Sequence, residues 1–318
     1  MKRADCLLAD LALQGLTIQL NRYKSVLESI ETTKGKALSR FVSYCSNRLG
    51  MDVIPLPYFG HRYESSGDFT YYSEFASRLV KKYYVVSADG SDPEVFWPLV
   101  THELAHCWLS RTDQAERIFW QHFATLSGIG REDGTSQIEE ALCDGLATKI
   151  MGPSYPFSFL GKFWAGLQLE SGPTHPSNQL RLEIMARILE TDSFSQEAEE
   201  IRETTERTFG TQSWKQDVIS GTLDDIGKVV GNVQLTGASS ALRGNLLSEV
   251  FEIDKSNHVT NGGIKLSCSE SSICQMFQAV WKTLSGGSAA DTSKFLREAS
   301  DEVVRWLNNV PTPANAQT

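Results

Sequence analysis

Five consecutive residues, His102, Glu103, Leu104, Ala105 and His106, have the types and spacing of a zinc hydrolase motif, H-E-x-x-H. On a helix the two histidines lie one turn apart on the same face, so both imidazoles can bind one Zn²⁺. Glu103 is then placed beside the metal, where it can act as the general base that takes a proton from an attacking water. These residues therefore predict metal-dependent hydrolysis of a peptide bond.

A catalytic zinc site needs a third ligand, and a second predicted helix, over residues 136–153 and closed by its final Gly-Pro pair, supplies one. Ser136 and Glu139 fit a capping box at its start, which leaves Glu140 free as the ligand and Glu139 as the alternative. Asp144 lies one turn after Glu140 and could accept a hydrogen bond from the outer nitrogen of a ligand histidine. Apolar residues at every fourth position predict its buried face: Ile138, Leu142, Leu146 and Ile150.

The elements that must position these residues are a strand and the metal helix that follows it. Residues 83–86 are β-prone and are followed by the turn signal Asp-Gly. Asp92 is expected to cap the metal helix, with Pro93 in its first position. Pro98 lacks an N–H group, so we expect the helix to kink or restart there, one turn before His102.

Three motifs in the order H-E-x-x-H, E-x-x-x-D and T-H-P resemble the catalytic core of gluzincin metallopeptidases. The second motif runs from Glu140 to Asp144, and the third is Thr174-His175-Pro176, followed by Arg181. The resemblance is to the HtpX and CAAX-prenyl-protease type and covers about residues 83–189. Those relatives are membrane proteins, whereas this chain has no apolar run of about 18 residues. Small soluble gluzincins of the minigluzincin kind are therefore the more similar form.

The resemblance implies three zinc ligands: His102, His106 and Glu140. It also implies that Glu103 is the general base, that His175 acts on the transition state or the substrate, and that Arg181 supports the site. An oxyanion formed during hydrolysis needs a cationic or hydrogen-bonding partner, for which His175, Tyr155 and Arg181 are the candidates. We rank His175 first among them.

Composition limits the classes of partner. The formal net charge is −9, which argues against a general affinity for nucleic acid. We expect no transmembrane segment, and the early apolar stretch is interrupted by Asp5 and Asp10, unlike a secretory leader. The six cysteines form no C-x-x-C pair, so reduced thiols and a cytoplasmic location are expected. Cys107 and Cys143 flank the proposed ligands and are alternative soft ligands, although buried packing is the expected role of both.

The sequence as a whole predicts a predominantly helical α+β protein with a small β-sheet, an active-site helix and a glutamate helix, flanked by N- and C-terminal helices. Its expected parts are an N-terminal helical segment (1–50), a zinc metallopeptidase core (51–190), a C-terminal helical region (191–310) and a disordered tail (311–318). The helices expected outside the core lie at about 5–30, 34–49, 198–208, 214–230, 241–251, 273–284 and 293–307. The expected function is zinc-dependent cleavage of a protein or peptide substrate. A catalytically silent binding module and a zinc hydrolase of another amide are the alternatives.

Overall fold

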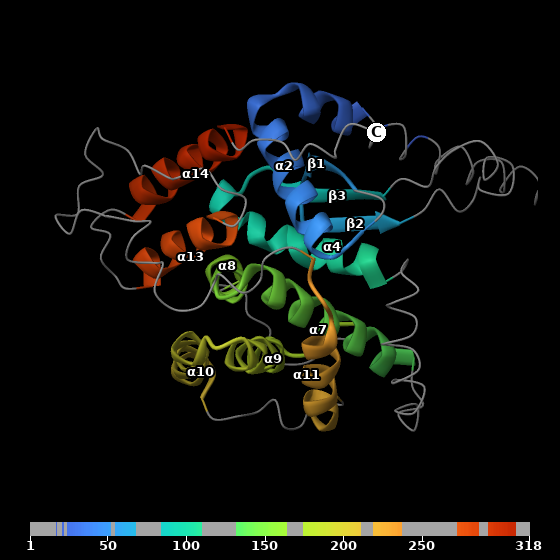
Figure 1. Cartoon of the computed structure of the whole chain (residues 1–318), viewed down its shortest axis with the longest axis vertical. Coiled ribbons are helices and arrows are strands. Elements are labelled where there is room, and N and C mark those ends of the chain that lie inside the picture. Colours follow the sequence, from blue (N-terminus) through green and yellow to red (C-terminus); the bar gives the residue numbers. More distant parts are fainter. Residues whose placement is uncertain are drawn as a thin grey trace, which may run out of the picture.

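The computed structural model of the chain describes residues 17, 21, 24–51, 55–67, 84–109, 132–163, 174–210, 219–236, 272–285 and 292–309. Over these residues the chain is mostly helical and has one small β-sheet, which confirms the predicted α+β class (Figure 1). The sheet lies between helices from the two ends of the chain and the helices of the central part.

The sheet has three described strands, in the order β1-β3-β2. Strand β3 (Tyr84–Asp89) lies in the middle, parallel to β1 (Leu56–Gly60) and antiparallel to β2 (Glu64–Gly67). It coincides with the strand predicted at 83–86 and continues to the Asp-Gly turn. Helix α4 (Val100–Leu109) packs directly on β2 and β3, so the sheet supports the helix that carries the H-E-x-x-H motif.

A short 3₁₀ helix, η2 (Glu94–Leu99), connects β3 to helix α4 (Val100–Leu109). The α-helix therefore starts just after Pro98, as the missing N–H of this proline predicts. The predicted cap at Asp92 is wrong, because Pro93 occupies the N-cap position and no side chain caps this helix. The Asp92 carboxylate instead accepts hydrogen bonds from Lys162 at 2.5 Å and Tyr63 at 3.1 Å.

Helix α7 (Glu132–Met151) carries the E-x-x-x-D motif and lies against α4. All four predicted apolar positions of its inner face are buried: Ile138, Leu142, Leu146 and Ile150. The helix ends as predicted, because Gly152 adopts a left-handed φ of 59° that favours glycine. The predicted capping box is wrong, since the helix begins at Glu132 and Ser136 already lies inside it.

The central helices that follow α7 are α8 (Ser154–Phe163), α9 (Asn178–Thr191), α10 (Ser195–Phe209) and α11 (Leu223–Asn232). The hydroxyl of Ser177 caps α9 by accepting a hydrogen bond from the Leu180 N–H at 3.2 Å. Helix α9 packs against α7 and α10 (Figure 1). Arg181 on α9 and His175 just before it thereby reach side chains of α7. Of the helix predicted at 214–230, residues 214–218 lie outside the described residues. Ser220–Thr222 form a 3₁₀ turn, η6, and the α-helix α11 begins at Leu223 and continues to Asn232.

Helices from the two ends of the chain pack together beside η2. Helix α14 (Thr292–Asn309) contacts α2 (Thr33–Arg48) and η2, and α13 (Ser272–Ser285) contacts α8. The helices predicted at 34–49, 198–208, 273–284 and 293–307 are thereby confirmed. The helix predicted at 241–251, the tail 311–318 and most of the first predicted helix lie outside the described residues. Among the helices that the structure describes, none combines the length and apolar character needed to cross a bilayer.

Candidate metal centre

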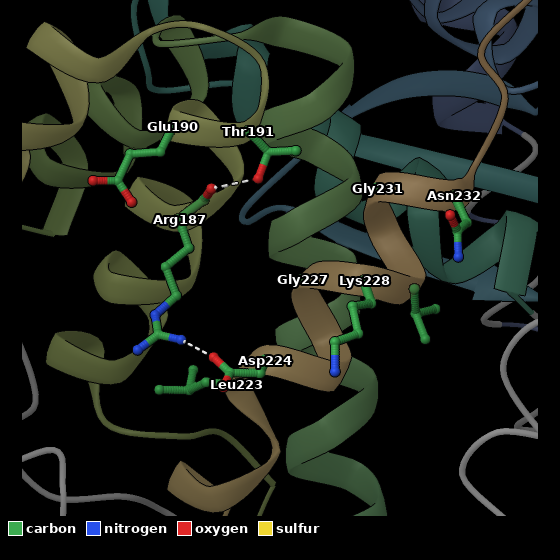
Figure 2. Close-up of a pocket in the computed structure, with 10 residues that line it drawn as sticks. Arg187, Glu190, Thr191, Leu223, Asp224, Gly227, Lys228, Gly231 and Asn232 are labelled. Atoms are coloured by element: carbon green, nitrogen blue, oxygen red, sulfur yellow. Dashed lines mark hydrogen bonds and ion pairs between the residues drawn. The ribbon is translucent and has the colours of Figure 1, made fainter.

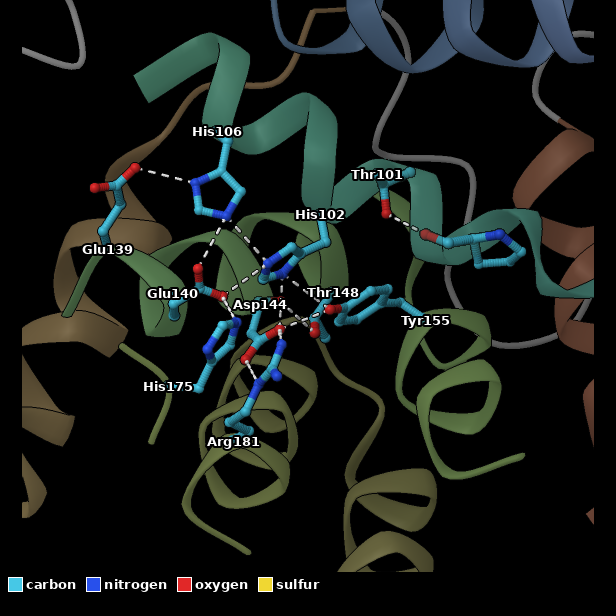
Figure 3. Close-up of polar contacts among 11 residues, drawn as sticks. Thr101, His102, His106, Glu139, Glu140, Asp144, Thr148, Tyr155, His175 and Arg181 are labelled. Carbon is cyan, nitrogen blue, oxygen red and sulfur yellow. Dashed lines mark hydrogen bonds and ion pairs between the residues drawn. The ribbon is translucent and has the colours of Figure 1, made fainter. Parts of the chain in front are cut away.

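The imidazoles of His102 and His106 point from α4 toward Glu140 on α7 (Figure 3). Their Nε2 atoms lie 3.2 Å apart. Oε2 of Glu140 lies 3.1 Å from Nε2 of His102, and Oε1 lies 3.3 Å from Nε2 of His106. Two nitrogens and a carboxylate thus converge at one place, and this group could hold a metal ion.

The packing of α4 on α7 produces this convergence. Leu104 and Ala105, two of the three residues between the histidines, are completely buried, and so is Ala141 next to Glu140. Burial of these apolar side chains holds the two helix backbones together. The polar side chains between the two helices are removed from water and must therefore form hydrogen bonds with one another.

Asp144 holds His102 from the opposite side of the imidazole. Its Oδ1 lies 2.9 Å from Nδ1 of His102, the contact expected one turn after Glu140. The Arg181 guanidinium donates to both carboxylate oxygens, at 2.6 Å and 2.8 Å, and the Tyr155 hydroxyl donates to Oδ1 at 2.6 Å. A neutral His102 that donates its Nδ1–H to Asp144 leaves the lone pair on Nε2, where a metal would bind.

Asp144 stays charged although its side chain is 0% exposed. Burial alone would raise the pKa of this carboxyl group, but the charge and hydrogen bonds of Arg181, together with those of His102, lower the pKa to about 2. The Arg181 guanidinium also lies over the Phe159 ring, 4.7 Å from its centroid. Asp144 and Arg181 thus form a buried, hydrogen-bonded ion pair behind His102.

His106 has a different carboxylate partner. Its Nδ1 lies 3.0 Å from Oε1 of Glu139. Sequence reasoning assigned Glu139 to the helix start or considered it a rival ligand, and missed this contact. The adjacent acids Glu139 and Glu140 could have indicated this contact. Consecutive side chains differ in direction by about 100° around a helix axis, so both carboxylates can reach a neighbouring helix such as α4.

The protons of the metal-free site are shared between histidines and carboxylates. Burial lowers the pKa of His102, but Asp144 and Glu140 raise it above its ordinary value. Burial likewise raises the pKa of Glu140, but its hydrogen bonds to His102 and His106 bring it well below the ordinary value. A metal bound by these groups would have to displace protons, so metal affinity is expected to rise with pH.

Of the three candidates for an oxyanion partner, two are bound to Asp144. Tyr155 is buried and donates to Asp144, and Arg181 is bound to the same carboxylate. His175 lies in the segment before α9, with its side chain 49% exposed and its Nε2 3.3 Å from Oε2 of Glu140. His175 is thus the candidate with access to a substrate.

Glu103 is partly buried on α4 between the two histidines. Within the part of the chain that the structure describes, its carboxylate forms no hydrogen bond or ion pair, unlike Glu139, Glu140 and Asp144. This carboxylate is therefore available to exchange a proton with a bound molecule.

Cys107 and Cys143, the alternative ligands, are buried and form no disulfide, and neither belongs to the group that could hold a metal. Burial raises the pKa of each thiol to about 12, so both are neutral thiols near pH 7. Cys45 and Cys274 are also free and buried.

A pocket of about 930 Å³ opens elsewhere, between α9 and α11 (Figure 2). It is lined by Arg187, Glu190 and Thr191 of α9 and by residues of α11, and contains none of the metal-site residues. The Arg187 guanidinium across it is bound to Asp224. The imidazole and carboxylate groups that could hold a metal ion lie on α4 and α7 instead.

Comparison with known proteins yields no relative: no protein-family model, no curated protein and no solved structure matches this chain. The function of the chain must therefore be inferred from the residues of the site themselves.

Proposed function

We propose that this protein is a zinc-dependent metallopeptidase of the gluzincin type that cleaves peptide bonds in a protein or peptide substrate. The observation that carries the proposal is the convergence of His102, His106 and Glu140. The two Nε2 atoms lie 3.2 Å apart, and each lies 3.1–3.3 Å from one of the two carboxylate oxygens of Glu140. In a tetrahedral zinc site, Zn–N bonds of about 2.0–2.1 Å separate neighbouring ligand atoms by about 3.3–3.4 Å. The residues therefore fit Zn²⁺ in size as well as in ligand type.

Two imidazoles and one carboxylate are the ligand set of catalytic rather than structural zinc sites, because three protein ligands leave one position for water or substrate. A structural site would be expected to supply four. The exposed His175 beside Glu140 is consistent with access from solvent on that side. This set of three ligands thus favours a catalytic zinc site over a zinc site that only stabilises the fold.

When bound, Zn²⁺ would acidify a water and polarise the scissile carbonyl. Glu103 takes the proton of the attacking water on its carboxylate and passes it to the departing amine. His175 donates a hydrogen bond from Nε2 to the developing oxyanion. Asp144 keeps His102 in one tautomer and orientation, and Arg181 keeps Asp144 charged.

The proposal is tested with the zinc-loaded full chain, a mixed library of fluorescence-quenched peptides, and the variants Glu103→Gln and Glu199→Gln. Glu103→Gln should lose about 10²–10⁴-fold in rate while keeping its zinc, because a general base contributes this much. Glu199 is exposed on α10 and serves as the matched control. Full activity of Glu103→Gln, or cleavage of small N-acyl compounds but of no peptide, would contradict the assignment.

A further inference from the structure

The two proposed ligand histidines each contact a further carboxylate, and these two carboxylates differ in their exposure to solvent. Asp144, behind His102, is 0% exposed and is paired with Arg181. Glu139, behind His106, has a side chain that is 44% exposed. The histidines differ in exposure in the same direction: the side chain of His102 is 10% exposed and that of His106 is 19% exposed. His106 is thus the outer ligand.

Two consecutive residues of α7 hold the two nitrogens of this one imidazole. Oε1 of Glu139 lies 3.0 Å from Nδ1 of His106, while Oε1 of Glu140 lies 3.3 Å from Nε2. With Nδ1–H donated to Glu139, the lone pair of a neutral His106 is on Nε2, on the side of Glu140. Without Glu139, both the tautomer and the ring orientation lose this constraint.

We propose that Glu139 is the positioning residue of His106 and sets how tightly, and for how long, the outer ligand stays on the metal. The inference rests on the proposed zinc site. Because His106 and its support both reach the solvent, metal exchange begins on this side, whereas the buried Asp144 and Arg181 keep His102 in place. Partners of this kind typically change metal affinity 10–100-fold when they are removed.

The experiment compares wild type, Glu139→Ala, Glu139→Gln and the control Glu199→Ala. Zinc affinity is measured by competition with a chromophoric chelator, and the release rate by transfer of zinc to excess chelator. We expect Glu139→Ala to bind zinc about 10–100-fold more weakly and to release it faster. Glu139→Gln should restore much of the loss, because its amide oxygen can still accept the hydrogen bond from Nδ1.

Two further readouts separate positioning from a general effect on the fold. The melting temperature of the metal-free protein should be the same for Glu139→Ala and Glu199→Ala, and the visible spectrum of the Co²⁺-loaded protein should change only in Glu139→Ala. If wild type binds one zinc and Glu139→Ala matches it in affinity and release rate, the inference fails while the proposed function stands. If wild type binds no zinc, the proposed function itself fails, and this inference with it.

Discussion

Replacing Arg181 with methionine should lower the free energy of unfolding by about 3–5 kcal/mol, because the change leaves the Asp144 carboxylate buried without its cation. Arg181 donates two hydrogen bonds to this carboxylate, at 2.6 Å and 2.8 Å. Hydrogen bonds to charged groups contribute about 1.5–3 kcal/mol each, which gives a loss of the same size. Methionine keeps an apolar side chain against the Phe159 ring, so little of the loss reflects packing.

The assay is urea denaturation of the metal-free full chain, followed by tryptophan fluorescence. Arg187→Met is the matched control on the same helix: its guanidinium pairs with Glu183 and Asp224 but is 33% exposed, so a loss of about 0–1 kcal/mol is expected. A loss below about 1 kcal/mol for Arg181→Met, equal to that of the control, would refute the view that Asp144 and Arg181 form a desolvated pair.

Two further predictions concern stability. Burial raises the pKa of Asp144, but the contacts of Arg181 and His102 together lower it from its ordinary 3.8 to about 2. Its stabilisation is therefore complete above pH 3.8 and is lost as the pH falls through about 2. The unfolding free energy of wild type should therefore fall more steeply with acid than that of Asp144→Asn, and parallel acid titrations would contradict this origin. Gly152→Ala should cost about 1–2 kcal/mol in urea denaturation, because φ is 59° there and the new Cβ would also displace the Gln278 amide. Gly227→Ala, with open space around the new Cβ inside α11, should instead stabilise the protein by about 0.5–1 kcal/mol, and a loss equal to that of Gly152→Ala would contradict the assigned cause.

The convergence of His102, His106 and Glu140 at the candidate metal site could be anticipated because it depends on helical spacing. His102 and His106 are one turn apart on α4, and Asp144 is one turn after Glu140 on α7, so each pair lies on one face whatever the rest of the fold does. The restart of the helix after Pro98 and the end of α7 at Gly152 likewise follow from local backbone chemistry.

The errors arose where a polar side chain had a choice of partners. Asp92 could cap the metal helix locally, but it is bound to Lys162, 70 residues later in the chain. Glu139 fitted a capping box, but α7 extends one turn further toward its N-terminus, and Glu139 contacts His106. The parallel pairing of β1 with β3 is equally non-local, since it depends on the tertiary arrangement rather than on either strand alone.

The most direct test of the central claim is the zinc content per chain, measured by elemental mass spectrometry on wild type and Glu140→Ala after zinc loading and removal of the excess. The account predicts about one zinc in wild type and a clear loss in Glu140→Ala, because the variant removes one of three ligands while His102 and His106 remain. The absence of zinc from wild type, or an equal content in both proteins, would contradict the three-ligand site on which the proposed function depends.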